Sequence, residues 1–151
     1  MSVDTADRTM VLERVIKAPV SVVWAAWMNA ESLPHWWGPD GYTCRTARID
    51  LRQGGEWVFD MIGPDGTVYP NHHRYTVVEP ESRISYTLHW GEDGPKHADA
   101  TATFEAVEGA TKVTLNMTLA TAAEYETAKS FGAVELGLQT LGKLARMIGA
   151  E

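Results

Sequence analysis

The sequence predicts an α+β fold in which a single antiparallel sheet is covered by a long C-terminal helix. Between residues 42 and 119 the chain alternates apolar and polar residues in six segments, a period typical of strands with one covered face. Helical spacing of apolar residues is found instead over residues 20–37 and 122–148. Because the sheet face is the only large apolar surface available, we expect the last helix to pack against it.

The first part of the chain predicts one strand followed by two short helices. Residues 8–17 are rich in Val, Ile and Met, and this strand ends before Pro19, a residue that suits the first turn of a helix. Apolar residues then recur at helical spacing over residues 20–28. A second short helix over residues 31–37 ends at a Gly-Pro pair.

Six further strands are predicted in the middle of the chain, which brings the sheet to seven. The turn at residues 63–66 reads Gly-Pro-Asp-Gly, a good turn sequence. The strand over residues 97–107 places alanines at 98, 100 and 102 on its apolar face, where small side chains fill little volume. The six segments are residues 42–51, 56–62, 67–79, 83–90, 97–107 and 111–119.

The C-terminal helix begins at a capping box formed by Thr121 and Glu124. Glycines at 132, 137 and 142 interrupt it, and each costs about 1 kcal/mol relative to Ala in a helix interior. They predict a kink, a close approach of two backbones, or unfilled space. Apolar residues recur at spacings of three and four, which predicts a buried stripe of Phe131, Val134, Leu138, Leu141, Ala145 and Ile148.

Length and composition favour one globular domain. A chain of 151 residues is short for two independent cores, and 44% hydrophobic residues exclude disorder as the main state. We therefore expect a flexible leader over residues 1–7 and a single domain over residues 8–151.

Charge and chain features exclude several classes of partner. With 13 basic and 20 acidic residues, the net charge of -7 argues against nucleic acid and against an anionic membrane surface. Apolar runs are too short to span a membrane, and the first ten residues lack the apolar core of a signal peptide. We expect a cytoplasmic protein.

Metal and thiol chemistry find little support in the sequence. The single Cys44 excludes an intrachain disulfide and a thiolate metal site, and it would act as a nucleophile only if its pKa were lowered. The five histidines lack the HExxH and His-x-His spacings that bind metals. We expect no metal, no cofactor and no assigned catalytic residue.

Four segments of the chain together resemble the activator of heat-shock-protein-90 ATPase homology family, part of the START-related helix-grip superfamily. Their most specific motifs are Trp36-Trp37-Gly38-Pro39, and Gly54-Gly55-x-Trp57 followed by the turn at residues 63–66. The resemblance implies a seven-stranded antiparallel sheet that grips the C-terminal helix and encloses a cavity. The segments are residues 12–43, 50–69, 77–87 and 101–117.

Two features depart from the family pattern. The eukaryotic co-chaperones of this name carry a separate N-terminal docking domain, for which this chain has no room. Many relatives also have an aromatic residue after the glycine of the last helix, whereas here Leu138 follows Gly137.

The cavity is expected to be lined by apolar residues that alternate along their strands and so share one face of the sheet. Tyr86, His73 or Arg74 would hold a polar end of the ligand. Neighbours in a strand point to opposite faces, so only one of His72 and His73 can face inward, and the pattern leaves open which one. The alternative is a solid core. The predicted lining residues are Trp36, Trp37, Trp57, Phe59, Met61, His73, Arg74, Tyr86, Leu88, Trp90, Met117, Leu138 and Leu141.

These patterns predict a small binding protein that holds an apolar or amphipathic molecule between sheet and helix. Two alternatives stay open. The resemblance implies a stand-alone co-chaperone that contacts heat-shock protein 90 and stimulates its ATPase. A pocket His or Tyr would also suit a cyclase, hydratase or hydrolase, although no GxSxG, P-loop, GxGxxG or paired-carboxylate motif is present. A homodimer through apolar surface around the two short helices is a further alternative.

Overall fold

Residues 8–92 and 94–150 are described by a computed structural model, so the predicted leader over residues 1–7 lies outside the described part. The first three elements are β1 (Thr9–Ile16), α1 (Val20–Trp27) and α2 (Leu33–Trp36). They match the predicted strand and two short helices, although α2 is a single turn. Six strands follow: β2 (Thr43–Ile49), β3 (Glu56–Ile62), β4 (Val68–Glu79), β5 (Arg83–His89), β6 (Lys96–Val107) and β7 (Ala110–Leu119).

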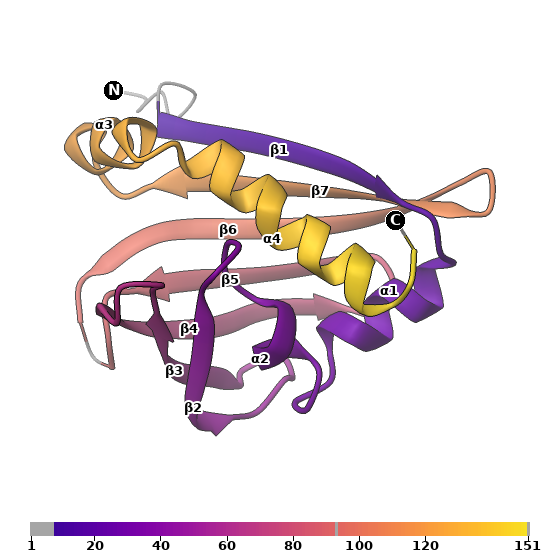
Figure 1. The fold of residues 1–151 in the computed structure, drawn as a ribbon, viewed down its shortest axis with the longest axis horizontal. Helices are drawn as coiled ribbons and strands as arrows, with labels where there is room; N and C mark the ends of the chain where they lie inside the picture. Colours follow the sequence, from indigo (N-terminus) through magenta and orange to yellow (C-terminus); the bar gives the residue numbers. More distant parts are fainter. Residues whose placement is uncertain (1–7, 93, 151) are drawn as a thin grey trace.

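The seven strands form one antiparallel sheet in the order β1-β7-β6-β5-β4-β3-β2, which confirms the predicted fold class. β1 pairs with β7 although they lie at opposite ends of the chain. Figure 1 shows the C-terminal helix crossing one face of the sheet, with α1 beside its C-terminal end. We call this covered face the inner face.

The middle of the inner face is occupied by small side chains. Ala98, Ala100 and Ala102 of β6 are buried there. Register places Ala100 directly between Tyr86 of β5 and Met117 of β7. A large residue therefore stands on each side of a short one, and this part of β6 adds little volume to the core.

The two short helices are held against the sheet by indole rings. Trp27 of α1 meets Trp36 of α2 edge to face at 5.0 Å between ring centroids, and it meets Phe104 of β6 at 5.4 Å. The buried Trp36 ring donates its indole N–H to the Ala26 carbonyl at 3.1 Å. Edge-to-face packing of this kind adds about 0.5–1.5 kcal/mol per pair beyond area burial.

The C-terminal helical region is divided in two, which corrects the prediction of one helix over residues 122–148. α3 (Ala122–Ser130) ends at Phe131, and α4 (Ala133–Met147) begins after Gly132. Gly132 has a left-handed backbone with φ of 72°, a conformation that glycine adopts without strain. The predicted cap is present, since the Thr121 hydroxyl accepts a hydrogen bond from the Glu124 N–H at 3.0 Å.

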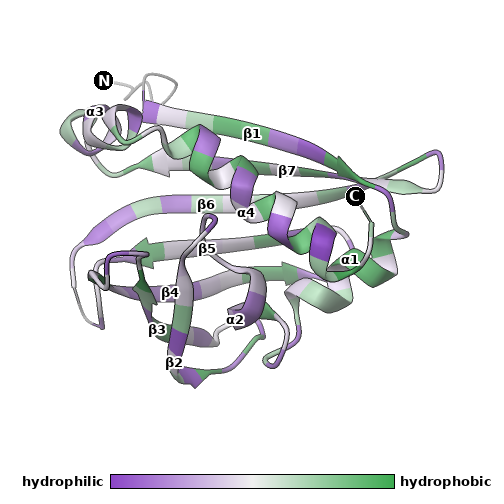
Figure 2. Ribbon diagram, viewed as in Figure 1, coloured by the Kyte–Doolittle hydropathy of each residue, from purple (hydrophilic) through white to green (hydrophobic). Residues whose placement is uncertain are grey.

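The break also corrects the predicted apolar stripe. Leu141 and Ala145 are buried as expected, whereas Phe131 is 75% exposed and Val134 is 38% exposed. The left-handed residue changes the direction of the chain, so the helical phase does not carry over from α3 to α4. Figure 2 shows α4 striped in purple and green, as expected for a helix with one apolar face.

The glycine at 137 marks a close approach to the sheet. A Cβ added at Gly137 would lie 2.5 Å from Leu12 Cδ2 of β1, closer than real Cβ contacts come. Three glycines in the sequence predicted a kink, a close approach or unfilled space, and Gly132 and Gly137 provide the first two.

Replacing Gly132 with Ala is expected to lower the free energy of unfolding by about 1–2 kcal/mol, because a Cβ is strained in the left-handed region. A Cβ at this position meets nothing within 4 Å, so the loss comes from backbone strain alone. Gly132→Asn is the matched control and should lose less, since Asn tolerates this conformation. Chemical denaturation measures both, and equal losses for Ala and Asn would contradict the explanation.

Candidate functional site

A pocket of about 310 Å³ lies between the inner face of the sheet and helices α3 and α4. This volume is near the lower end of the range of about 300–1,000 Å³ for small-molecule sites. Most of the wall is apolar. Its residues come from β3 to β7, from both C-terminal helices and from the segment after α2.

The structure places eight of the thirteen predicted lining residues on this wall. Five of them project from the inner face of β3, β4, β5 and β7, and alternate along their strands as the period of two requires. Their ligand-binding role stays a prediction. The eight are Trp37, Met61, His73, Tyr86, Leu88, Trp90, Met117 and Leu141.

Three predicted aromatic residues lie in the core and are not among the residues of the wall. Trp36, Trp57 and Phe59 are all fully buried. The Trp57 and Phe59 rings stack on each other at 3.6 Å, and the Trp57 indole N–H donates to the Thr46 hydroxyl at 3.1 Å. These rings support the pocket from behind, because they pack against side chains that line it.

Arg74 and Leu138 are also placed away from the wall. Arg74 is exposed on the outer face of the sheet, as it must be when His73, its neighbour in β4, points inward. Leu138 is half-buried and packs against the core, whereas Leu136, Gly137 and Thr140 of α4 line the pocket. Arg74 therefore cannot hold a ligand in this pocket.

Sequence reasoning missed one face of α3. Glu124, Thr127, Ala128 and Phe131 all line the pocket. Their spacing of three, one and three is the helical signal that could have found them, but the predicted stripe began only at Phe131. From the sheet, Asn71, His97 and Leu115 were missed as well.

Exposure defines an inner end and a mouth of this pocket. At the inner end, His73 and Tyr86 are 3% and 2% exposed. At the mouth, Trp90 is 42% and Phe131 75% exposed. A ligand would therefore leave water progressively as it moves from the Trp90 side toward Tyr86.

Tyr86 carries an unpaired polar group at the inner end. Among the described residues its buried hydroxyl has no hydrogen-bond partner. Burial raises the pKa of the phenol, so the hydroxyl keeps its proton and remains a donor. A buried hydroxyl without a partner costs about 1–3 kcal/mol, and a ligand oxygen could recover this energy.

His73 is enclosed by rings. Its imidazole stacks on Tyr86 at 4.6 Å between centroids and meets Trp37, Trp57 and Phe59 edge to face. Burial, followed by the charge of neighbouring His72, lowers the pKa of His73 to about 3. The ring is thus neutral at physiological pH.

A histidine and a glutamate lie side by side at the mouth. His97 Nδ1 of β6 is within hydrogen-bond reach of Glu124 Oε2 of α3. The His97 ring also packs on Trp90 at 4.2 Å between centroids. This contact connects α3, which has no buried residues of its own, to the edge of the pocket.

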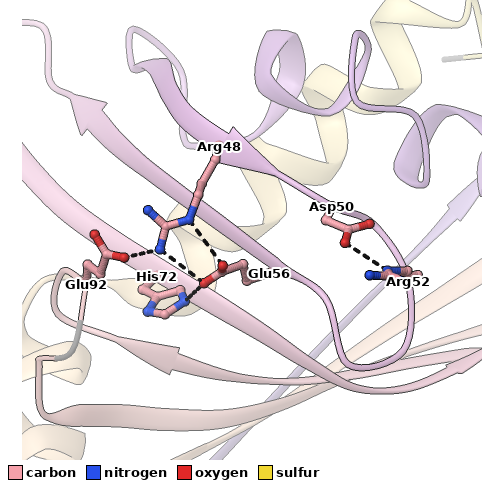
Figure 3. Close-up of polar contacts among 6 residues, drawn as sticks. All are labelled: Arg48, Asp50, Arg52, Glu56, His72 and Glu92. Carbon is pink, nitrogen blue, oxygen red and sulfur yellow. Dashed lines mark hydrogen bonds and ion pairs between the residues drawn. The ribbon is translucent and has the colours of Figure 1, made fainter.

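The outer face of the sheet carries a separate polar cluster, which Figure 3 shows centred on Arg48 and Glu56. His72 Nε2 lies 2.7 Å from Glu56 Oε1, and Arg48 Nε donates to Glu56 Oε2 at 3.1 Å. Glu92 pairs with the same guanidinium. Hydrogen bonds from Arg48, and then from His72, hold the pKa of Glu56 below its usual value. The adjacent histidines thus point to opposite faces of the sheet: His72 lies on the outer face, and His73 lies on the pocket wall of the inner face.

Cys44 is not arranged as a nucleophile. Burial raises the pKa of its thiol to about 12, and the thiol donates to the Trp37 carbonyl at 3.4 Å.

Within residues 8–92 and 94–150, no three His, Cys, Asp or Glu side chains converge in a way that could hold a metal ion. None of the helices in this part of the chain is both long and apolar enough to cross a membrane.

Comparison with protein families decides the classification. The family model described as "Activator of Hsp90 ATPase homolog 1-like protein" matches residues 17–149. The chain belongs to this family. The match confirms the resemblance found in the sequence motifs, whereas no curated protein sequence is significantly similar to the chain.

Several solved structures share the fold described above. A protein from Nitrosomonas europaea is 24% identical with a TM-score of 0.86, and the match covers 97% of each chain. A protein from Arthrobacter aurescens is 21% identical with a TM-score of 0.86, covering 98% of this chain and 90% of the other. The AHSA1-like protein from Aeromonas hydrophila is 20% identical with a TM-score of 0.68, covering 93% and 92%.

The pocket environment of His73 predicts a pH-dependent stability. Its folded pKa of about 3 lies below the ordinary value of 6.5, so between these values the unfolded chain binds a proton that the folded chain excludes. Stability should therefore fall as pH decreases from about 6.5 toward 3, by at most about 1.4 kcal/mol per pH unit for one proton. His73→Phe should make this slope shallower in denaturation experiments across that range.

His35→Asn is the control for this prediction, because it removes an exposed imidazole from α2. If both variants changed the slope equally, the buried position of His73 would not be the cause.

Proposed function

We propose that this protein binds an apolar or amphipathic small molecule in the pocket between the sheet and helices α3 and α4. One observation carries the proposal: an unpaired, buried tyrosine hydroxyl stands on the wall of a largely apolar pocket of about 310 Å³. Small-molecule sites typically combine such an apolar wall with a few polar groups that orient the ligand.

The driving force would be the removal of apolar surface from water, at about 25 cal/mol per Å². Leu88, Leu115 and Leu141 provide aliphatic contacts, while Trp37 and Trp90 provide flat ring surfaces. Trp90 and Phe131 at the mouth would be covered when a ligand binds. Their exposed apolar surface in the free protein is therefore consistent with a binding site.

Binding is favoured over catalysis by the properties of the two inner polar groups. A general acid or base works best with a pKa near the operating pH. Burial moves the pKa of His73 down to about 3 and that of Tyr86 up, so both move away from neutrality. These two side chains are suited to recognising a ligand oxygen rather than to moving protons.

Ala128→Trp tests the proposal, with the neutral dye N-phenyl-1-naphthylamine as the probe. Dye fluorescence should rise on binding to the wild-type protein, and the large indole on the pocket wall should weaken binding by at least about tenfold, which corresponds to about 1.4 kcal/mol. Titration of the dye against both proteins measures the affinity.

Ala123→Trp is the matched control, because Ala123 is exposed on the same helix and is not among the residues of the pocket wall. It should leave dye affinity unchanged. Equal weakening by both substitutions, or no dye binding by the wild type, would reject the pocket as the binding site. ATPase stimulation of a heat-shock protein 90 without dye binding would favour the co-chaperone alternative instead.

A further inference from the structure

We propose that the pocket selects uncharged ligands with a carbonyl or hydroxyl oxygen at the end that enters first, and that it discriminates against carboxylates on the same skeleton. This inference rests on the proposed binding function and specifies the chemistry of the ligand. It follows from where the pocket has hydrogen-bonding groups and where it has charges.

The inner end offers a hydrogen bond without a charge. The Tyr86 hydroxyl is buried and has no partner among the described residues, so it can donate to an oxygen that arrives in the pocket. His73 stacks on the same ring and is buried to a similar degree. Because burial keeps both groups neutral, a neutral ligand oxygen can be paired there without burying an ion.

A carboxylate at the inner end would find no cationic side chain among the described residues of the pocket wall. The described pocket wall includes no Lys, Arg or Asp, and its only Glu is Glu124 at the mouth. The amine of Lys143 in α4 donates to the carbonyls of Pro39 and Tyr42 and is not part of the wall. A buried carboxylate needs a cation or several donors to offset its lost hydration, and one phenol is a weak substitute.

Binding is also disfavoured for a carboxylate ligand that enters with its apolar end first. Its charge would then lie at the mouth, close to the Glu124 carboxylate, which is already paired with His97. Repulsion between like charges opposes this orientation. Both orientations therefore disfavour acids, whereas a ketone or alcohol meets neither penalty.

Three naphthalenes of matched shape test the inference by competition with N-phenyl-1-naphthylamine at pH 7: 2-acetylnaphthalene, 2-naphthoate and 2-ethylnaphthalene. The ketone is expected to bind at least about tenfold more tightly than the carboxylate, in line with the cost of burying an unpaired charge. A carboxylate that bound as tightly as the ketone would overturn the inference, as would failure of all three to compete.

Tyr86→Phe identifies the group responsible. It should weaken binding of the ketone by about 2- to 10-fold, the range for one net hydrogen bond, and leave affinity for 2-ethylnaphthalene unchanged. Tyr75→Phe is the matched control, because Tyr75 is a buried neighbour of Tyr86 that is not part of the pocket wall. It should not alter ketone binding.

The outcomes separate the two proposals. If the dye itself does not bind the wild-type protein, the binding function fails. If the dye binds but Tyr86→Phe weakens the ketone and the hydrocarbon equally, binding stands and the proposed role of the Tyr86 hydroxyl is wrong. Retained affinity for the hydrocarbon also shows that the variant is folded.

Discussion

The structure depends on how one helix covers the inner face of a seven-stranded sheet. The buried residues of α4 lie between Thr140 and Ala145, and the helix approaches β1 closely where Gly137 has no side chain. Strand β6 presents Ala98, Ala100 and Ala102, which are too short to fill the remaining space. A pocket results beside α4, and α3, which precedes the turn at Gly132, forms another part of its wall.

This arrangement also determines the polarity of the pocket. The aromatic rings around His73 exclude water, and exclusion of water penalises the charged form of any group. His73 and Tyr86 are consequently neutral polar groups in a largely apolar wall. Leaving the Tyr86 hydroxyl unpaired costs stability in the free protein, and under the proposed function a ligand oxygen would recover that cost.

Charge is concentrated on the opposite face of the sheet. Arg48 connects Glu56 and Glu92 there, and His72 is buried beneath this cluster. Since side chains alternate along β4, a single step in sequence separates the charged environment of His72 from the apolar environment of His73. Glu124 at the mouth is thus the one acidic residue among the described residues of the pocket wall.

The sequence by itself determined the order of the strands and of the two short helices, the antiparallel sheet and the inward direction of five wall residues, because these follow from local periodicity and turn chemistry. It identified Tyr86, Leu88 and Met117 as inward-facing for this reason. Only the tertiary structure decided which of His72 and His73 faces inward, since both parities of that strand carry apolar residues. It also decided that Trp57 and Phe59 are core and that α3 contributes to the wall. Those outcomes depend on how far the helix stands from the sheet and where Gly132 turns the chain, and neither is encoded in the spacing of neighbouring residues.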